Sequence, residues 1–294
     1  MTAPASASPL EIPPEWERIN FSRLTGVVLV VGAPDAGKTT LAQFMFDRLA
    51  ALGRRVAFLD GDPGQSRLGP PTTITLALDA GDVPPLVPDG RAWRAFIGST
   101  TPNGHMQPML TGASRLVQAS AAEVVVYDTC GLIDPSAGGL ALKQALVDLF
   151  SPVTVIAIQS RTELEPFLVP LRRSARAEVL TFAPAAAARR RSLTNRQAHR
   201  REQYARHFQN AHDLEVHWTR FAVFPMPRFR LNRLVALEGP HGFTRALGIV
   251  VGIERDARQI TLRTPLASLH GIDAMRLGDV DLNPDTVEDQ RLGS

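Results

Sequence analysis

The chain has 294 residues, of which 44% are hydrophobic and 21% charged, and its formal net charge at pH 7 is +3. No apolar run approaches the roughly 20 residues that span a bilayer, which excludes a membrane-spanning protein. The single cysteine, Cys130, excludes an internal disulfide framework and a cysteine-based zinc site, and it favours a reducing, cytoplasmic setting.

The first two-thirds of the chain alternate between predicted strands and helices. Residues 1–24 lack the basic and apolar regions of a secretory signal, and we expect them to become ordered near Trp16. An apolar, β-branched run at 27–31 is typical of a buried parallel strand, and it leads through a turn at 32–40 into a helix ending near Gly53. The later elements are strands at 56–59, 124–127, 153–158 and 179–182, and helices at about 106–122 and 140–150. This order predicts an α/β fold with a mostly parallel sheet and helices on both faces.

The last third of the chain has a different character. From about Arg189 the sequence predicts a polar, arginine-rich helix that forms a lid at about 189–210. Short β-like stretches separated by Gly and Pro follow, at 221–224, 245–253 and 259–264. We therefore expect three parts, an N-terminal segment at 1–24, a P-loop domain with its lid at 25–215, and a small all-β domain at 216–294.

Residues 32–39 carry a phosphate-binding motif. They read Gly-Ala-Pro-Asp-Ala-Gly-Lys-Thr and fit G-x-x-x-x-G-K-[ST] between a predicted strand and a helix. In such a loop, backbone N–H groups converge on the phosphates, the lysine reaches the β- and γ-phosphates, and the threonine hydroxyl ligates Mg²⁺. Only Lys38 and Lys143 are lysines among the 32 basic residues, so composition does not explain a lysine here. The motif predicts an ATP and Mg²⁺ site that comprises Gly32, Ala33, Pro34, Asp35, Ala36, Gly37, Lys38, Thr39 and Thr40.

Carboxylates follow two of the predicted strands. One strand ends in Asp60 and Asp62, and another continues into Asp128 and Gly131. Because open α/β folds bind ligands at the carboxyl ends of their strands, these groups should meet the phosphate loop. Asp128 is expected in the Mg²⁺ shell, and the backbone of Gly131 near the γ-phosphate. Asp60 and Asp62 both stand as candidates for a general base.

Two other nucleotide-binding classes fit less well. GTPases read guanine with Asn-Lys-x-Asp after a later strand, but the strand at 153–158 continues with Gln159-Ser160-Arg161-Thr162. Partitioning and metal-pump ATPases carry an extra lysine early in the loop, where this chain has Ala33.

The predicted lid helix is strongly cationic. Arg196 and Arg200 share one helical face, and Arg191 lies near the helix start. Guanidinium groups bind phosphates bidentately, and one directed at a γ-phosphate neutralises charge in the transition state. A polyanionic acceptor would explain so dense a cluster. The arginines of this cluster are Arg189, Arg190, Arg191, Arg196, Arg200, Arg201 and Arg206.

Four segments are similar to those of one known family. They are the loop GAPDAGKTT, the stretch LDGDPGQSRLGPPTTITL, the segment IGSTTPNG at 97–104, and the helix RSLTNRQAHRREQYARHF at 191–208. In these segments the chain resembles the polynucleotide 5′-hydroxyl kinases of pre-mRNA cleavage, tRNA splicing and ribosomal-RNA processing. The likeness covers most of residues 25–210, and the β-rich tail is similar to the family's C-terminal domain. It implies transfer of the γ-phosphate of ATP to the 5′-hydroxyl end of RNA or DNA.

The resemblance also implies roles for individual residues. Asp62 would act as the general base or orient the hydroxyl. The catalytic set would be Lys38, Asp62, Arg191, Arg196 and Arg200. The metal would be held by Thr39, Asp62 and Asp128. The substrate contacts would be Asp60, Gln65, Ser99, Thr100, Thr129 and Gly131, with the hydroxyl of Thr101 nearby.

The chain departs from the family pattern in two places. Relatives often have a tryptophan where this chain has Leu132, and a glycine where it has Thr72. The larger eukaryotic members also have an N-terminal β domain for which we expect no room here. Without the resemblance, the residues predict a Mg²⁺-ATP phosphotransferase with a basic lid. Two other functions stay open, a regulatory ATPase or GTPase switch and a nucleotide-bound scaffold in an RNA-processing assembly.

Overall fold

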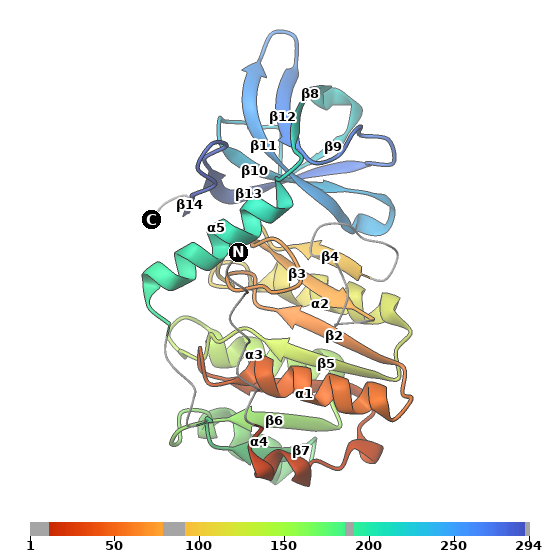
Figure 1. Cartoon of the computed structure of the whole chain (residues 1–294), viewed down its shortest axis with the longest axis vertical. Coiled ribbons are helices and arrows are strands. Elements are labelled where there is room, and N and C mark those ends of the chain that lie inside the picture. The colour runs from red at the N-terminus through yellow and green to blue at the C-terminus, as the bar shows by residue number, and fades with distance from the viewer. Residues whose placement is uncertain (1–11, 79–91, 186–190, 292–294) are drawn as a thin grey trace, which may run out of the picture.

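The protein consists of an α/β unit and a β-sheet module that are joined by a long helix, as the computed structural model shows (Figure 1). The structure describes residues 12–78, 92–185 and 191–291. Predictions for residues 1–11, for Arg189 and Arg190, and for residues 292–294 lie outside these ranges. Within them, no helix combines the length and the apolarity needed to cross a bilayer. The cytoplasmic setting stays a prediction.

The first sheet has seven strands in the order β4-β3-β2-β5-β1-β6-β7. Five of them are parallel. Beyond β2 the sheet continues with β3, which is antiparallel to β2, and then β4, which is antiparallel to β3. The strands are β1 (Gly26–Gly32), β2 (Val56–Gly61), β3 (Thr73–Ala77), β4 (Ala92–Phe96), β5 (Val124–Thr129), β6 (Thr154–Ile158) and β7 (Glu178–Phe182). The helices are α1 (Lys38–Ala51), α2 (Met106–Ser120), α3 (Gly139–Phe150) and α4 (Glu165–Ser174).

Helices cover both faces of this sheet, which confirms the predicted fold class. One face packs on α2, α3 and α4, through residues such as Leu116, Leu146 and Leu168. The other face packs on α1 and on a short 3-10 helix, Pro14–Arg18, whose Trp16 is buried and lies against Phe44. The central strands β1, β2, β5 and β6 are buried on both sides, so they are mostly apolar rather than alternating, which is why they were predictable.

Three elements of the α/β unit were not predicted. Strands β3 and β4 pair antiparallel and follow no βαβ alternation. Helix α4 carries Pro166 in its first turn and Pro170 inside it, and proline disfavours a helix interior. Tertiary packing overrides this preference, because Phe167, Leu168 and Leu171 are buried in the core.

The second sheet forms the predicted small all-β module. Its strands run in the order β14-β13-β10-β11-β12-β8, and β9 also pairs with β13. The first of them starts at residue 212, four residues before the expected boundary, and the division at 215/216 stays a prediction. The strands are β8 (His212–His217), β9 (Ala222–Phe224), β10 (Arg233–Glu238), β11 (Thr244–Glu254), β12 (Gln259–Thr264), β13 (Ala274–Leu282) and β14 (Asp289–Arg291). The sequence did not indicate β8, β10, β13 or β14.

The predicted arginine-rich helix is α5 (Leu193–His207), which bridges the two units (Figure 1). The Ser192 side chain caps its start by accepting a hydrogen bond from the Asn195 N–H at 3.1 Å. Its C-terminal half is anchored, because Tyr204 is buried in a cluster with Phe96 of β4 and Leu247 of β11. The N-terminal half therefore projects over the α/β unit from a fixed base.

Direct contacts also hold the β module against the α/β unit. The Asp279 N–H donates to the Gly98 carbonyl at 2.7 Å, and Nε2 of His105 lies 3.1 Å from Asp279 Oδ2. A Cβ on Gly278 would lie 2.9 Å from the Phe96 ring, so only glycine allows this close approach. The sequence left His105 without a role, and the structure places it at this interface.

Thr72 occupies a position that ordinarily requires glycine. Its φ of 72° lies in the left-handed region, and its side chain is buried. Its N–H donates to the Pro63 carbonyl, and its own carbonyl accepts from the Ile97 N–H, both at 2.8 Å. Thr72 thereby joins the loop after β2 to the loop after β4, and its left-handed backbone agrees with the glycine that the family resemblance implies at this position.

His207 of α5 predicts a loss of stability at acidic pH. Burial, assisted by the charge of Arg94, lowers its pKa from 6.5 to about 3, and its Nε2 accepts a hydrogen bond from the Leu247 N–H. Between these two pH values the unfolded chain binds a proton that the folded chain does not, so folding weakens as the pH falls below 6.5. At pH 5 this difference in proton binding lowers the free energy of unfolding by on the order of 2 kcal/mol.

Urea unfolding at pH 7.5 and pH 5.0 measures this effect. His207→Gln should reduce the loss of stability between the two pH values by that amount, whereas the exposed His217→Gln should leave it as in the wild type. Equal pH dependence in all three proteins would contradict the assignment.

Candidate active site

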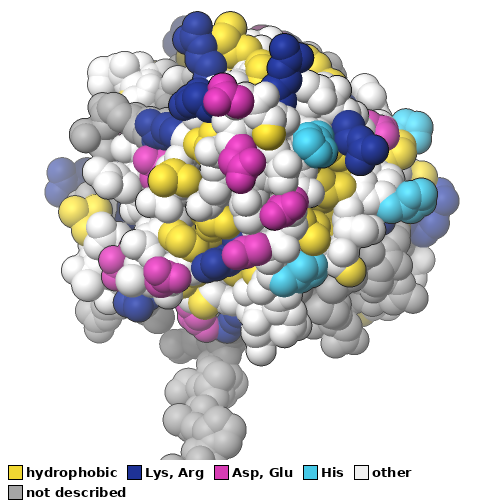
Figure 2. Space-filling view, turned by 90° about the horizontal axis from the view of Figure 1, so that it is seen from above, with side chains coloured by type: hydrophobic (Ala, Val, Ile, Leu, Met, Phe, Trp, Pro, Cys, Tyr) yellow, Lys and Arg dark blue, Asp and Glu magenta, His cyan; other side chains and the backbone are white. Residues whose placement is uncertain are grey.

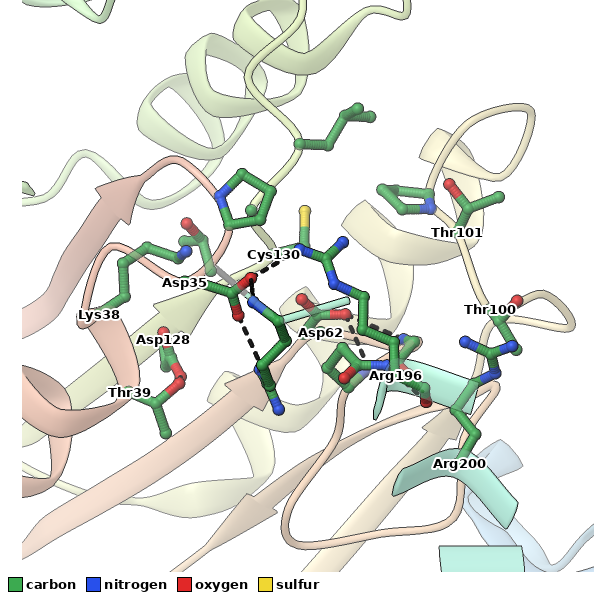
Figure 3. Close-up of a pocket in the computed structure, with 18 of the residues that line it drawn as sticks. Asp35, Lys38, Thr39, Asp62, Thr100, Thr101, Asp128, Cys130, Arg196 and Arg200 are labelled. Carbon is green, nitrogen blue, oxygen red and sulfur yellow. Dashed lines mark hydrogen bonds and ion pairs between the residues drawn. The ribbon is translucent and has the colours of Figure 1, made fainter. Parts of the chain in front are cut away.

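A cleft of about 920 Å³ lies at the carboxyl ends of the parallel strands. Its floor is the phosphate loop, and its walls are the loops that follow β2, β4 and β5. The N-terminal half of α5 lies over it, and β14 of the second sheet closes its far end. Figure 3 shows Lys38, Thr39 and Asp128 on one side of this cleft and Thr100, Thr101 and Arg200 on the other.

The phosphate loop has the backbone conformation that the motif requires. Asp35 and Gly37 have φ values of 59° and 98°, which turn successive N–H groups inward before α1 begins at Lys38. Lys38 is buried, and its Nζ donates to the Ala33 carbonyl at 2.8 Å. Burial lowers the pKa of Lys38, while the charges of Asp128 and Asp62 oppose that shift.

Asp128 is held where a metal ligand belongs. The Thr39 hydroxyl donates to its Oδ2 at 2.5 Å, which joins the end of β5 to the start of α1. Its other oxygen, Oδ1, is buried and accepts no hydrogen bond from the described residues. Burial raises the pKa of Asp128 to about 7, although Lys38 and Thr39 both favour the charged form. A buried, unpartnered carboxylate oxygen next to a threonine hydroxyl fits a hard cation such as Mg²⁺.

The two carboxylates that follow β2 have different surroundings. Oδ2 of Asp60 accepts hydrogen bonds from the Ser66 hydroxyl at 2.9 Å and from the Arg67 and Leu68 N–H groups at 2.6 and 3.0 Å. Burial nevertheless raises the pKa of Asp60. Asp62 lines the cleft and is only half-buried. Both carboxylates line the cleft, but Asp60 is the more buried of the two, and three donors on its Oδ2 tie it into the loop.

The two carboxylate oxygens of Asp62 differ in their hydrogen bonding. Its Oδ1 accepts from the Gly64 and Gln65 N–H groups at 2.9 and 3.0 Å, and these bonds hold the side chain in a local turn. Its Oδ2 accepts no hydrogen bond from the described residues, so it keeps its lone pairs for a ligand in the cleft. This difference supports Asp62, which the family resemblance favours over Asp60, and its role as the base stays a prediction.

The lid arginines divide into two groups. Arg191 and Arg196 both pair with Asp35 of the phosphate loop, at 2.8 and 2.7 Å. Burial by itself would raise the pKa of Asp35, but the hydrogen bonds from the two arginines outweigh burial and hold it below its usual value. Arg200 lies one turn further along α5 and pairs with Asp289 of β14 at 2.9 Å. The sequence indicated a shared site for all three and did not indicate either carboxylate partner.

Two further hydrogen bonds hold α5 over the loop that follows β2. Nε2 of His199 donates to the Ser66 carbonyl at 2.9 Å, and the Gln65 amide donates to the Arg196 carbonyl at 3.3 Å. The predicted Gln65 therefore lines the cleft and contacts the lid at the same time.

The other predicted residues are distributed unevenly around the cleft. Thr100, Thr129 and Gly131 line it, although the Thr129 hydroxyl is buried and donates to the Val30 carbonyl at 2.8 Å. Ser99 is buried behind the wall, where its hydroxyl accepts from the Thr101 N–H. The loop residues that line the cleft are Pro34, Asp35, Gly37, Lys38, Thr39 and Thr40, while Gly32, Ala33 and Ala36 support them from outside it. The substrate contacts stay predictions.

Sequence reasoning missed two features of this site. Strand β14 contributes Asp289, Gln290 and Arg291 to the far end of the cleft, and nothing local in its sequence indicated this. Lys143 of α3 is fully buried, and its Nζ donates to the Cys130 carbonyl at 2.6 Å, directly before Gly131. The rarity of lysine was the available signal for Lys143.

Gly131 leads to a prediction about nucleotide affinity. A Cβ at this position would lie 2.7 Å from Cα and 2.8 Å from N of Pro34, both backbone atoms of the phosphate loop. Gly131→Ala should therefore displace the loop and weaken binding of a fluorescent ATP analogue about tenfold, as forced overpacking costs 1–3 kcal/mol. Gly248→Ala is the matched control, because its nearest contacts would be 3.7 Å away. Equal dissociation constants for the two variants would contradict the prediction.

Comparison with known proteins agrees with this geometry. The family model described as "mRNA cleavage and polyadenylation factor CLP1 P-loop" matches residues 32–210. A polyribonucleotide 5′-hydroxyl-kinase of Methanocaldococcus jannaschii is 35% identical over 51% of this chain and 41% of its own length. Another, of Pyrococcus abyssi, is 33% identical over 66% of this chain and 54% of its own length. The chain thus spans about half the length of the curated relatives it matches.

The fold also matches a solved structure. A chain of a Clp1p–Pcf11p complex superposes with a TM-score of 0.69, covering 91% of this chain and 77% of the other. The two sequences are only 12% identical, so this likeness concerns the fold alone.

Proposed function

The chain belongs to the CLP1 P-loop family, and from this premise we propose that it transfers the γ-phosphate of ATP to the 5′-hydroxyl end of RNA or DNA. One observation carries the proposal. A phosphate loop, a carboxylate with an unpartnered oxygen and a pair of lid arginines meet in a single cleft, and they supply the groups that phosphoryl transfer to a hydroxyl needs. The activity named for the archaeal relatives supports the same reaction.

In this proposal the loop and its neighbours bind the nucleotide. The backbone N–H groups before α1 and the Lys38 ammonium surround the β- and γ-phosphates. Thr39 and Oδ1 of Asp128 would hold Mg²⁺, directly or through water, which neutralises charge on the phosphate oxygens. Asp62 lines the same cleft and would contact the metal from the acceptor side.

Asp62 serves the acceptor. Its Oδ1 is fixed by two backbone N–H groups, so Oδ2 has a defined direction into the cleft. There it accepts the proton of the 5′-hydroxyl while the hydroxyl oxygen forms a bond to the γ-phosphorus and the bond to the β-phosphate oxygen breaks. The products are ADP and a 5′-phosphorylated end. Positioning the two substrates in line supplies much of the acceleration.

Arg191 and Arg196 neutralise the transferring phosphoryl group from above. Asp35 holds both guanidinium groups beside the phosphate loop, so they are already close to the γ-phosphate position. Their positive charge stabilises the charge that develops on the equatorial oxygens during transfer. Arg200 acts at a greater distance, through its pairing with Asp289.

End-labelling tests the proposal. The protein is incubated with Mg²⁺, γ-labelled ATP and 5′-hydroxyl oligonucleotides of RNA and of DNA, and label is expected on the 5′ end. Lys38→Ala should abolish labelling. Release of labelled phosphate that is independent of any nucleic-acid end would identify a regulatory ATPase instead. Tight retention of ATP without turnover would identify a nucleotide-bound scaffold.

A further inference from the structure

Lysine is confined to two buried positions in this chain. Of the 32 basic residues, only Lys38 and Lys143 are lysines. Lys38 is 7% exposed and Lys143 is fully buried, so the basic side chains on the face of the molecule shown in Figure 2 are arginines. The chain thus keeps lysine only where protein encloses the cation. Lys38 belongs to the phosphate loop, whereas the proposed reaction gives Lys143 of α3 no role.

Lys143 holds the backbone of the loop that follows β5. Its Nζ donates to the Cys130 carbonyl at 2.6 Å and lies 3.3 Å from the Cys130 Sγ. Lys38 makes the same kind of contact in the phosphate loop, where its Nζ donates to the Ala33 carbonyl at 2.8 Å. The two loops meet, because Gly131 packs directly against the backbone of the phosphate loop. Two buried ammonium groups therefore fix the two loops that touch at the phosphate site.

The contact with Lys143 sets the direction of the Gly131 N–H. The Cys130–Gly131 peptide is trans, and in a planar trans peptide the carbonyl and the N–H point in opposite directions. A Cys130 carbonyl held toward α3 therefore turns the Gly131 N–H away from α3. Gly131 lines the cleft, and its N–H donates no hydrogen bond to any residue that the structure describes. This N–H is thus available to a ligand in the cleft.

The charge of Lys143 has no counter-ion in the described part of the chain. Its Nζ contacts only the carbonyl and the sulfur of Cys130, and no described carboxylate forms an ion pair with it. A buried cation without such a partner is destabilising by itself. Burial lowers the pKa of Lys38, and the charge of Lys143 contributes to the same shift. The two ammonium groups therefore act on the same region of the site.

The cleft beside Cys130 already contains much negative charge. Six aspartates line it, and two of them, Asp35 and Asp289, pair with arginines of α5. A triphosphate that enters the cleft adds negative charge next to the remaining carboxylates, and a buried cation behind Cys130 offsets part of that repulsion. The four aspartates that form no ion pair with a described residue are Asp60, Asp62, Asp128 and Asp134.

We propose that Lys143 is a positioning residue that makes the site select ATP over ADP. It acts through the Cys130–Gly131 peptide, whose N–H it directs at the terminal phosphate of the triphosphate. A cation at the carbonyl end of this peptide strengthens the hydrogen bond that the N–H donates. The same charge favours the additional negative charge that distinguishes a triphosphate from a diphosphate. This inference rests on the proposed function, in which ATP is the phosphate donor.

Lys143→Met tests this role, because methionine adapts to an apolar interior and carries neither a charge nor a donor. Leu146→Met is the matched control, a conservative change at another buried position of α3. Dissociation constants are measured with Mg²⁺ for fluorescent analogues of ADP and of non-hydrolysable ATP. Lys143→Met should weaken binding of the ATP analogue about tenfold and that of the ADP analogue by no more than about twofold. Leu146→Met should bind both as the wild type does.

A second measurement uses the wild type alone. Amide hydrogen exchange of the segment that contains Gly131 should be slower in the complex with the ATP analogue than in the complex with ADP, because only the triphosphate engages this N–H. Equal exchange in the two complexes would overturn the inference, even where Lys143→Met does not fold. In a folded Lys143→Met protein, an equal loss of affinity for both nucleotides, or no loss for either, would also overturn it.

These measurements need no nucleic acid, so they separate this inference from the kinase function. If Lys143→Met loses the preference for ATP while no 5′ end is ever labelled, nucleotide selection by Lys143 holds and the kinase function falls. If ends are labelled and Lys143→Met keeps the wild-type ratio of the two affinities, the kinase function holds and the inference is overturned. A wild type that binds neither nucleotide overturns both.

Discussion

Asp62→Asn is expected to lower kcat for 5′-end phosphorylation by about 10²- to 10⁴-fold, the usual contribution of a positioned general base. Asparagine can keep the turn, because its side-chain oxygen still accepts from the Gly64 and Gln65 N–H groups. It cannot take up the proton of the attacking hydroxyl. The affinity for ATP, measured with a fluorescent analogue, should stay within about twofold of the wild type. The loss should appear in single-turnover transfer of the labelled phosphate.

Asp60→Asn is the informative comparison. Asp60 is buried and its Oδ2 accepts three hydrogen bonds within the loop, so this change should lower thermal stability more than it changes the rate of the chemical step. Asp62→Asn should keep the wild-type melting temperature. Wild-type kcat in Asp62→Asn would remove Asp62 from the mechanism, and a selective loss of kcat in Asp60→Asn would assign the base to Asp60.

Arg196→Ala is expected to reduce kcat by about 10³- to 10⁵-fold, the effect of removing an arginine that stabilises the transferring phosphoryl group. Arg196 is the less exposed of the two arginines that pair with Asp35, and its backbone carbonyl also accepts from Gln65. Arg196→Lys should recover only a small part of the activity, because an ammonium group does not reproduce the bidentate geometry of a guanidinium group. Single-turnover labelling of a saturating oligonucleotide measures both variants.

Arg201→Ala provides the matched control on the same helix. Its side chain is 56% exposed and pairs with Glu288 at the surface, outside the cleft, so activity should be that of the wild type. A general effect of removing positive charge from α5 would lower activity equally in both variants and would contradict a specific role for Arg196. In that case α5 would act only by attracting the polyanion through its net positive charge.

Much of the α/β unit could be read from the sequence because its signals are local. The apolar run of β1, the glycines of the phosphate loop and the start of α1 at Lys38 lie within a few residues of one another. The parallel strands bring their carboxyl ends to one edge, so Asp62 and Asp128 could be expected beside the loop before any packing was known. Lys38, Thr39 and Asp128 do meet there.

The remaining features of the site depend on contacts between distant parts of the chain. Asp35 pairs with Arg191 and Arg196, which lie 156 and 161 residues away in the sequence. Arg200 pairs with Asp289, which lies 89 residues away. The choice between Asp60 and Asp62 depends on which carboxylate the folded loop surrounds with donors.

What the sequence by itself determined is the phosphate-binding half of the site, because residues close along the chain set its backbone geometry and its charge. What only the tertiary structure decided is the lid pairing and the wall formed by β14. Those contacts arise from how the second sheet packs against Phe96, Tyr204 and Gly98, and no periodicity along the chain encodes that packing.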